Sequence, residues 1–134
     1  MRAKFYVLVA GLGLLATSAP MMAHHSFTAE YDAAKPISLT GTVTKVEWMN
    51  PHARFYIDVK DDAGTVTNWE LELGSPNALM RLGWTRNSLK PGEQVSVEGS
   101  LAKDGSKLAN ARKVTLADGR KVFAGSAADS EDKK

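Results

Sequence analysis

The sequence predicts a small all-β barrel with five strands and one short helix, preceded by an export signal. Three observations lead to this fold class. Apolar residues recur mostly at every second position after residue 37, which is the period of half-buried strands. Short turn sequences separate these segments. One stretch only, near residues 76–82, changes to a helical pattern.

The first 23 residues have the pattern of a secretory signal peptide. Two basic side chains precede an unbroken apolar run at residues 7–16, and a small-residue stretch ends at Ala23. The run is shorter than the roughly 20 residues that a membrane-spanning helix needs. We therefore expect an exported, soluble periplasmic protein without membrane contact after cleavage. Cleavage after Ala23 is preferred, and cleavage after Met22 is the alternative.

Composition predicts one domain that is held together by packing alone. Removing 23 of the 134 residues leaves 111, enough for one core, and the chain has no cysteine for a disulfide. The full chain has 17 basic and 15 acidic residues, and the signal takes away two basic residues and no acidic one. The mature domain is then neutral. Because nucleic-acid binding normally needs a basic surface, we expect no nucleic-acid partner, and we expect a monomer.

The first expected strand, residues 37–48, changes phase along its length. Its apolar residues alternate as far as Val43 and resume one position out of phase at Val46, close to Gly41. A phase change beside a glycine in a strand is typical of a bend or a bulge. The strand is therefore expected to curve, as strands of barrels do.

The next two expected strands, residues 53–60 and 66–73, alternate cleanly. Trp69 lies on the inward phase, so we expect it in the core rather than on a stacking surface. Tyr56 is the outward aromatic residue. The outward charged side chains, which we expect to form a solvated face, are Arg54, Asp58, Glu70 and Glu72.

A short helix is expected next, because Ser75 can cap it, Pro76 suits its first position and Gly83 can end it. Its expected apolar stripe consists of Leu79, Met80 and Leu82. Trp84 after the helix is expected in the core. The strand period then returns at residues 94–102 and 107–123.

Three strands, a helix and two more strands are the element order of the five-stranded oligonucleotide/oligosaccharide-binding (OB) barrel. An open antiparallel sandwich with one helix is the alternative. The expected boundaries are a signal peptide at 1–23, an N-terminal arm at 24–36, an OB-like barrel at 37–123 and a disordered tail at 124–134.

Several motifs resemble a known family. They are HHSF at residues 24–27, NPH at 50–52, and PNAL with RLGW at 76–84, and the likeness covers nearly all of residues 24–126. The chain resembles a family of small exported bacterial proteins that is described only as a domain of unknown function. The resemblance implies export and the barrel fold, and it brings no assigned activity.

The histidines are the candidate metal ligands. Cleavage after Ala23 gives a new terminus at which the amine and imidazole of His24 form a chelating pair, with His52 or His25 as a further nitrogen. Cu(II) favours such nitrogen sets. We therefore expect copper as the possible cofactor, bound more weakly below about pH 6, where imidazoles are protonated. Cleavage after Met22 would instead give an Ala-His-His copper chelate.

Two alternatives remain open from the sequence. The histidines can be solvated or structural, and the expected partner is then an envelope component or small ligand. In that case the barrel is a module without metal that binds a glycan, peptide or envelope protein through an outer strand face or the loop at His52. No Ser/His/Asp order, phosphate loop or zinc-protease helix can be traced, so we expect no enzymatic activity.

Overall fold

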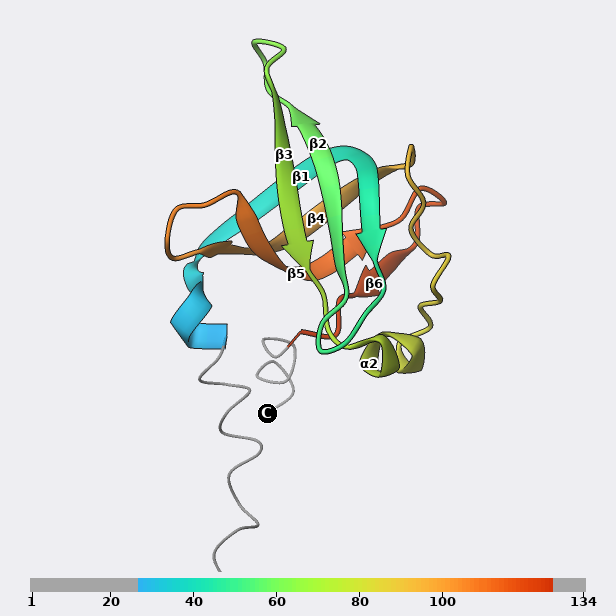
Figure 1. Cartoon of the computed structure of the whole chain (residues 1–134). Helices are drawn as coiled ribbons and strands as arrows, with labels where there is room; N and C mark the ends of the chain where they lie inside the picture. The colour runs from blue at the N-terminus through green and yellow to red at the C-terminus, as the bar shows by residue number, and fades with distance from the viewer. Residues whose placement is uncertain (1–26, 127–134) are drawn as a thin grey trace, which may run out of the picture.

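The computed structural model describes residues 27–126, which form a small β-barrel with a helix at one end (Figure 1). Residues 1–26 and 127–134, including the expected signal peptide, His24 and His25, lie outside the described part. The elements are β1 (Tyr31–Glu47), β2 (Arg54–Lys60), β3 (Val66–Glu72), α2 (Pro76–Arg81), β4 (Gln94–Ala102), β5 (Leu108–Thr115) and β6 (Lys121–Phe123).

The sheet closes on itself through a parallel pairing. Its strand order is β3-β2-β1-β4-β5-β6, and β3 also pairs with β5 in parallel, with Leu71 opposite Ala109. All the other pairings are antiparallel. Strands β1 to β5 therefore form a closed five-stranded barrel, as expected, and not an open sandwich. The three-residue strand β6 pairs with residues 113–115 of β5, beyond the part of β5 that pairs with β3.

Strand β1 curves so that it can pair with β4 through its first part and with β2 through its last part. The register with β2 shifts between Val43 and Lys45, which confirms the bulge expected from the phase change. A Cβ at Gly41 would lie 2.4 Å from the carbonyl oxygen of Asp58, so only glycine allows the backbone of β2 to approach this closely.

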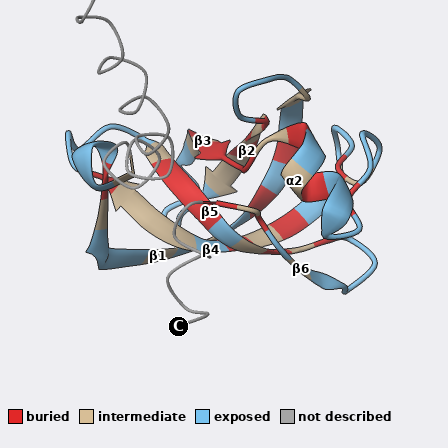
Figure 2. Ribbon diagram, turned by 90° about the horizontal axis from the view of Figure 1, so that it is seen from below, coloured by how far each residue is buried: buried red, intermediate tan, exposed pale blue. Residues whose placement is uncertain are grey.

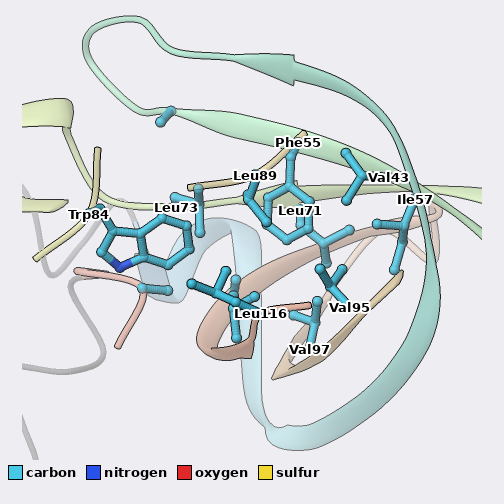
Figure 3. Close-up of a cluster of buried hydrophobic side chains, with 14 of the residues drawn as sticks. Val43, Phe55, Ile57, Leu71, Leu73, Trp84, Leu89, Val95, Val97 and Leu116 are labelled. Carbon is cyan, nitrogen blue, oxygen red and sulfur yellow. The ribbon is translucent and has the colours of Figure 1, made fainter. Parts of the chain in front are cut away.

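The barrel interior is filled by the apolar phases of the five strands (Figures 2 and 3). Trp69 and Trp84 both belong to this core, as expected, with exposures of 8% and 3%. The indole nitrogen of Trp84 donates a hydrogen bond to the carbonyl of Phe123 at 2.8 Å, so its one polar atom is satisfied. The side chains labelled in Figure 3 are Val43, Phe55, Ile57, Leu71, Leu73, Trp84, Leu89, Val95, Val97 and Leu116.

Helix α2 covers one end of the barrel. Its start is as expected: the Ser75 hydroxyl accepts a hydrogen bond from the backbone N–H of Ala78, and Pro76 occupies the first turn. Gly83 follows the helix with φ of +95°. The expected apolar stripe is wrong in part: Leu79 is buried, but Met80 and Leu82 are 52% and 40% exposed. The short helix packs only one side against the barrel, and Leu79 lies on that side whereas Met80 and Leu82 do not.

The ends of the barrel extend beyond the expected boundaries. Residues 27–30 form a helical turn, and β1 begins at Tyr31, six residues before the expected start. At the other end, Ala124 and Ser126 are buried, so the first residues of the expected tail belong to the packed domain. Within the described residues, no helix has the length and apolarity needed to cross a bilayer.

Replacing Trp69 by alanine should lower the free energy of unfolding by about 3 to 5 kcal/mol, because it removes a large buried ring from the barrel interior. Val66→Ala in the same strand is the control: Val66 is 52% exposed, so its truncation should change stability by less than about 0.5 kcal/mol. Chemical denaturation measures both values. Equal effects of the two substitutions would mean that Trp69 does not lie in the core.

Candidate functional site

His52 lies in the loop that joins β1 to β2, and two backbone hydrogen bonds attach this loop to the end of β3. The N–H of Ala53 donates to the carbonyl of Gly74 at 3.0 Å, and the N–H of Leu73 donates to the carbonyl of Ala53 at 2.8 Å. The Asn50–Pro51 peptide bond in the loop is cis. The backbone that carries His52 is therefore anchored to the barrel.

The imidazole of His52 is oriented by a hydrogen bond. Its Nδ1 lies 3.1 Å from the carbonyl oxygen of Leu73. A carbonyl oxygen only accepts, so Nδ1 carries the hydrogen, and Nε2 of the neutral ring keeps its lone pair. The side chain is 44% exposed. Histidines that bind metals are commonly held in this way, with one ring nitrogen bonded to a carbonyl and the other available to the ion.

A buried carboxylate lies beside His52. Glu72 is only 6% exposed, and its Oε1 is 3.8 Å from Nδ1 of His52. The Tyr31 hydroxyl donates to its Oε2 at 2.7 Å, and Nη2 of Arg54 lies 3.3 Å from the same oxygen. Arg54 Nη1 also contacts Glu70 Oε1 at 2.5 Å. We call these five residues, Tyr31, His52, Arg54, Glu70 and Glu72, the Glu72 network.

The Glu72 network joins the N-terminal arm to the His52 loop. Burial raises the pKa of Tyr31 well above its ordinary value, and the hydrogen bond to Glu72 raises it further, so the hydroxyl stays protonated and donates. Glu30 faces the same cluster: partial burial raises its pKa, repulsion from Glu72 adds to the rise, and Arg54 and His52 oppose it. The arm therefore passes close to His52.

Of the three predicted ligands, the structure places only His52, since His24 and His25 lie outside the described residues. Residues 27–126 contain no group of three or more histidine, aspartate or glutamate side chains arranged to hold a metal ion. A metal at His52 would therefore need ligands from beyond this range. The predicted copper site stays a prediction.

Sequence reasoning missed the Glu72 network. Glu72 and Arg54 were expected on a solvated face, because they fall on the outward phase of their strands. The structure corrects this for Glu72, which the arm covers. The signal that could have found it is the aromatic pair of the arm: Phe27 and Tyr31 have ring centroids 5.6 Å apart, and Tyr31 is 2% exposed. An aromatic arm must cover part of the barrel wall.

Several solved structures are similar to this chain in fold. One is the mitochondrial single-stranded DNA binding protein Rim1 from S. cerevisiae, with 13% identity over 61% of this chain and 92% of that chain and a TM-score of 0.48. Another is the N-terminal domain of PriB from Thermoanaerobacter tencongensis, with 18% identity over 62% of this chain and 96% of that chain and a TM-score of 0.46. A ZRD-deleted mutant of TiaS in complex with agmatine matches with 22% identity over 63% of this chain and 22% of that chain, and a TM-score of 0.45.

These comparisons contradict the expectation that nucleic acid is excluded as a partner. That expectation rested on the neutral charge of the mature chain, whereas Rim1 is described as a single-stranded DNA binding protein. Net charge is a sum over the whole surface and does not report how charges are distributed on one face. The exclusion is therefore withdrawn.

Sequence comparisons agree with the expected lack of an assigned activity. No curated protein matches the chain in sequence. Residues 11–111 match a sequence family that is described as a family of unknown function, DUF6152. This match covers most of the chain, from the apolar run near the N-terminus to the middle of β5. The chain therefore belongs to the DUF6152 family.

Proposed function

We propose that this protein is an exported periplasmic domain that binds one Cu(II) ion through its mature N-terminal histidine and His52. The observation that carries the proposal is the orientation and position of the His52 ring. A hydrogen bond from Nδ1 to the Leu73 carbonyl orients the ring. The carboxylate of Glu72 lies 3.8 Å from Nδ1 and also accepts a hydrogen bond from Tyr31, which belongs to the arm that leads to His24.

The proposed ligands are all nitrogens. His24 supplies its amine and its imidazole once the signal peptide is removed, His52 supplies Nε2, and His25 is the substitute for the third ligand. Cu(II) favours nitrogen ligands in a tetragonal plane and has the highest affinity of the common divalent metals. The chain contains no cysteine that would compete for the ion.

The short stretch of chain between the arm and His24 supports this ligand set. Only His25 and Ser26 lie between His24 and Phe27, the first described residue, and three residue steps span at most roughly 10 Å. Glu30 interacts electrostatically with both Glu72 and His52. Two carboxylates near the proposed site would favour a cation there over an anion.

We propose binding and not catalysis, because the sequence carries no recognised catalytic motif. A carrier or buffer of copper needs only a site with suitable affinity and access. The His52 side chain is 44% exposed, so an ion from solvent can reach it.

Processing gives the first test. Mass spectrometry of the protein from the periplasmic fraction of a bacterial host should show a mature chain that starts at His24, because the site needs a free amine on that residue. A chain that starts at Ala23 would move the copper chelate to the Ala-His-His form. A chain that keeps residues 1–23, or remains with the membrane, would contradict the proposal.

Copper titration of the processed protein should show one Cu(II) site. His52→Ala, and separately acetylation of the His24 amine, should each weaken the affinity by about 10-fold or more, or about 1.4 kcal/mol, because each removes a nitrogen ligand. Lys60→Ala, at the far end of β2, is the matched control and should leave the affinity unchanged. If neither ligand change alters the affinity or the copper spectrum, this site is wrong.

A module that binds a glycan, peptide or envelope protein without metal is the second candidate function. A groove of about 380 Å³ on the outer surface favours it. Ser38, Glu98 and Lys113 lie side by side across β1, β4 and β5 on this face, and Ser100 and Arg112 also line the groove. Hydroxyl and charged groups of this kind suit a polar ligand better than an apolar one.

A glycan array distinguishes the second candidate from the first. If the groove is the functional site, glycan binding should persist with a chelator present and in His52→Ala, and Lys113→Ala should weaken it about 10-fold through loss of a charged contact. Glycan binding that disappears with His52→Ala and returns with copper would instead assign the function to the metal site. Absence of any glycan retention would contradict a glycan ligand.

A further inference from the structure

The outer face of the sheet carries two neighbouring rows of mostly polar side chains that cross β1, β4, β5 and β6. These strands are adjacent in this order in the sheet (Figure 1). The strand register fixes the members of each row, because residues that pair across an antiparallel ladder lie opposite one another on the same face. The first row consists of Ser38, Glu98, Lys113 and Phe123. The second row consists of Thr40, Ser96, Thr115 and Lys121.

The side chains of both rows point away from the barrel interior. Val97 and Val114, which separate the two rows along β4 and β5, belong to the core, whereas the eight row residues are all at least partly exposed. The hydroxyl oxygens of Thr40 and Ser96 lie 2.9 Å apart, so these neighbouring members of the second row contact each other. The two rows therefore form one continuous polar surface.

Two irregularities in strand pairing hollow this surface. The register between β1 and β4 shifts between Asp32 and Pro36, and the register between β4 and β5 shifts between Glu98 and Gly99. A Cβ at Gly99 would clash with the carbonyl oxygen of Asn110, so β4 carries no side chain at this position. The groove of about 380 Å³ lies here, beside the first row. A second groove, of about 430 Å³, is lined in part by Thr40, Ser96 and Thr115.

The chemistry of the two rows suits a neutral sugar chain. Hydroxyl groups of serine and threonine donate and accept hydrogen bonds, lysine only donates, and a carboxylate only accepts, so sugar hydroxyls can pair with every polar member of the rows. Glu98 lies between Ser38 and Lys113, and its negative charge opposes the binding of a polyanion such as nucleic acid. Phe123 is 49% exposed at the end of the first row and offers an apolar ring against which a sugar can pack.

We infer that the outer face of β1, β4, β5 and β6 binds a linear neutral glycan of several sugar units, which covers both grooves. This inference rests on the second candidate function and names its ligand class. Neighbouring strands lie about 4.8 Å apart, so each row is roughly 14 Å long, and the two rows are roughly 7 Å apart along the strands. A monosaccharide covers only part of such a surface, so the affinity should increase with the number of sugar units.

The test is a titration of the processed full chain with chito-oligosaccharides and cello-oligosaccharides of one to six units, which are linear and neutral. In at least one series, the affinity measured by calorimetry should rise by about 10-fold or more between one and four units. Backbone NMR signals of both rows should shift on binding. An affinity that does not depend on the number of sugar units would overturn the extended site.

Two substitutions examine the parts of the face that lie outside the first groove. Thr115→Val removes one hydroxyl and should weaken binding of the four-unit sugar about 5-fold, the effect of one net hydrogen bond. Phe123→Ala removes the exposed ring and should weaken it about 10-fold. Thr67→Val, on β3 and outside the four strands of this face, is the matched control and should leave the affinity unchanged. Unchanged affinity in both row variants, or an equal loss in Thr67→Val, would overturn the inference.

The same experiments separate failure of this inference from failure of the second candidate function. A monosaccharide that binds as tightly as the four-unit sugar, with signal shifts confined to the first groove, would overturn the extended site and leave glycan binding in that groove intact. No binding of either series would overturn the inference, whereas the second candidate function survives if Lys113→Ala weakens the retention of another glycan. Tighter binding of single-stranded DNA, weakened by Thr115→Val, would assign this face to a polyanion and overturn the neutral ligand class.

Discussion

The parallel pairing of β3 with β5 is the constraint on which the rest of the structure depends. It involves only three residue pairs, yet it closes the sheet into a barrel and seals Leu71 and Ala109 inside. The same pairing sets Glu72 opposite Asn110, and both side chains are buried. Closure of the barrel therefore places the buried carboxylate of Glu72 on the outer face of the sheet, where β3 pairs with β5.

A buried carboxylate is costly unless charged or hydrogen-bonding groups surround it. Here the partners come from two separate parts of the chain, Tyr31 from the arm and Arg54 from β2. The His52 ring lies 3.8 Å from the other carboxylate oxygen, so Glu72 lies between the arm and the His52 loop. The site that we propose between these two segments requires no cavity in the barrel interior, which is filled by side chains.

Local patterns in the sequence were enough to predict the barrel. The change of phase near Val43 predicted the bulge in β1, and Ser75 with Pro76 predicted the start of α2. Periodicity fails where another segment, here the N-terminal arm, covers the outer face of a strand. It indicates on which face of the strand a residue lies, but not what packs over that face. For this reason periodicity alone could not predict the burial of Glu72 or the early start of β1 at Tyr31. The histidine pair at residues 24–25 could be recognised as candidate ligands, but the hydrogen bond that orients His52 depends on the distant Leu73.

The central claim is that the arm and the His52 loop form one metal site. A crystal structure of the processed, copper-loaded protein, with copper located by anomalous scattering, tests it most directly. Our account predicts a single copper bound to the amine and imidazole of His24 and to Nε2 of His52, with Nδ1 of His52 still bonded to the Leu73 carbonyl. Copper bound only to the N-terminal residues, or bound to His52 through Nδ1, would contradict it.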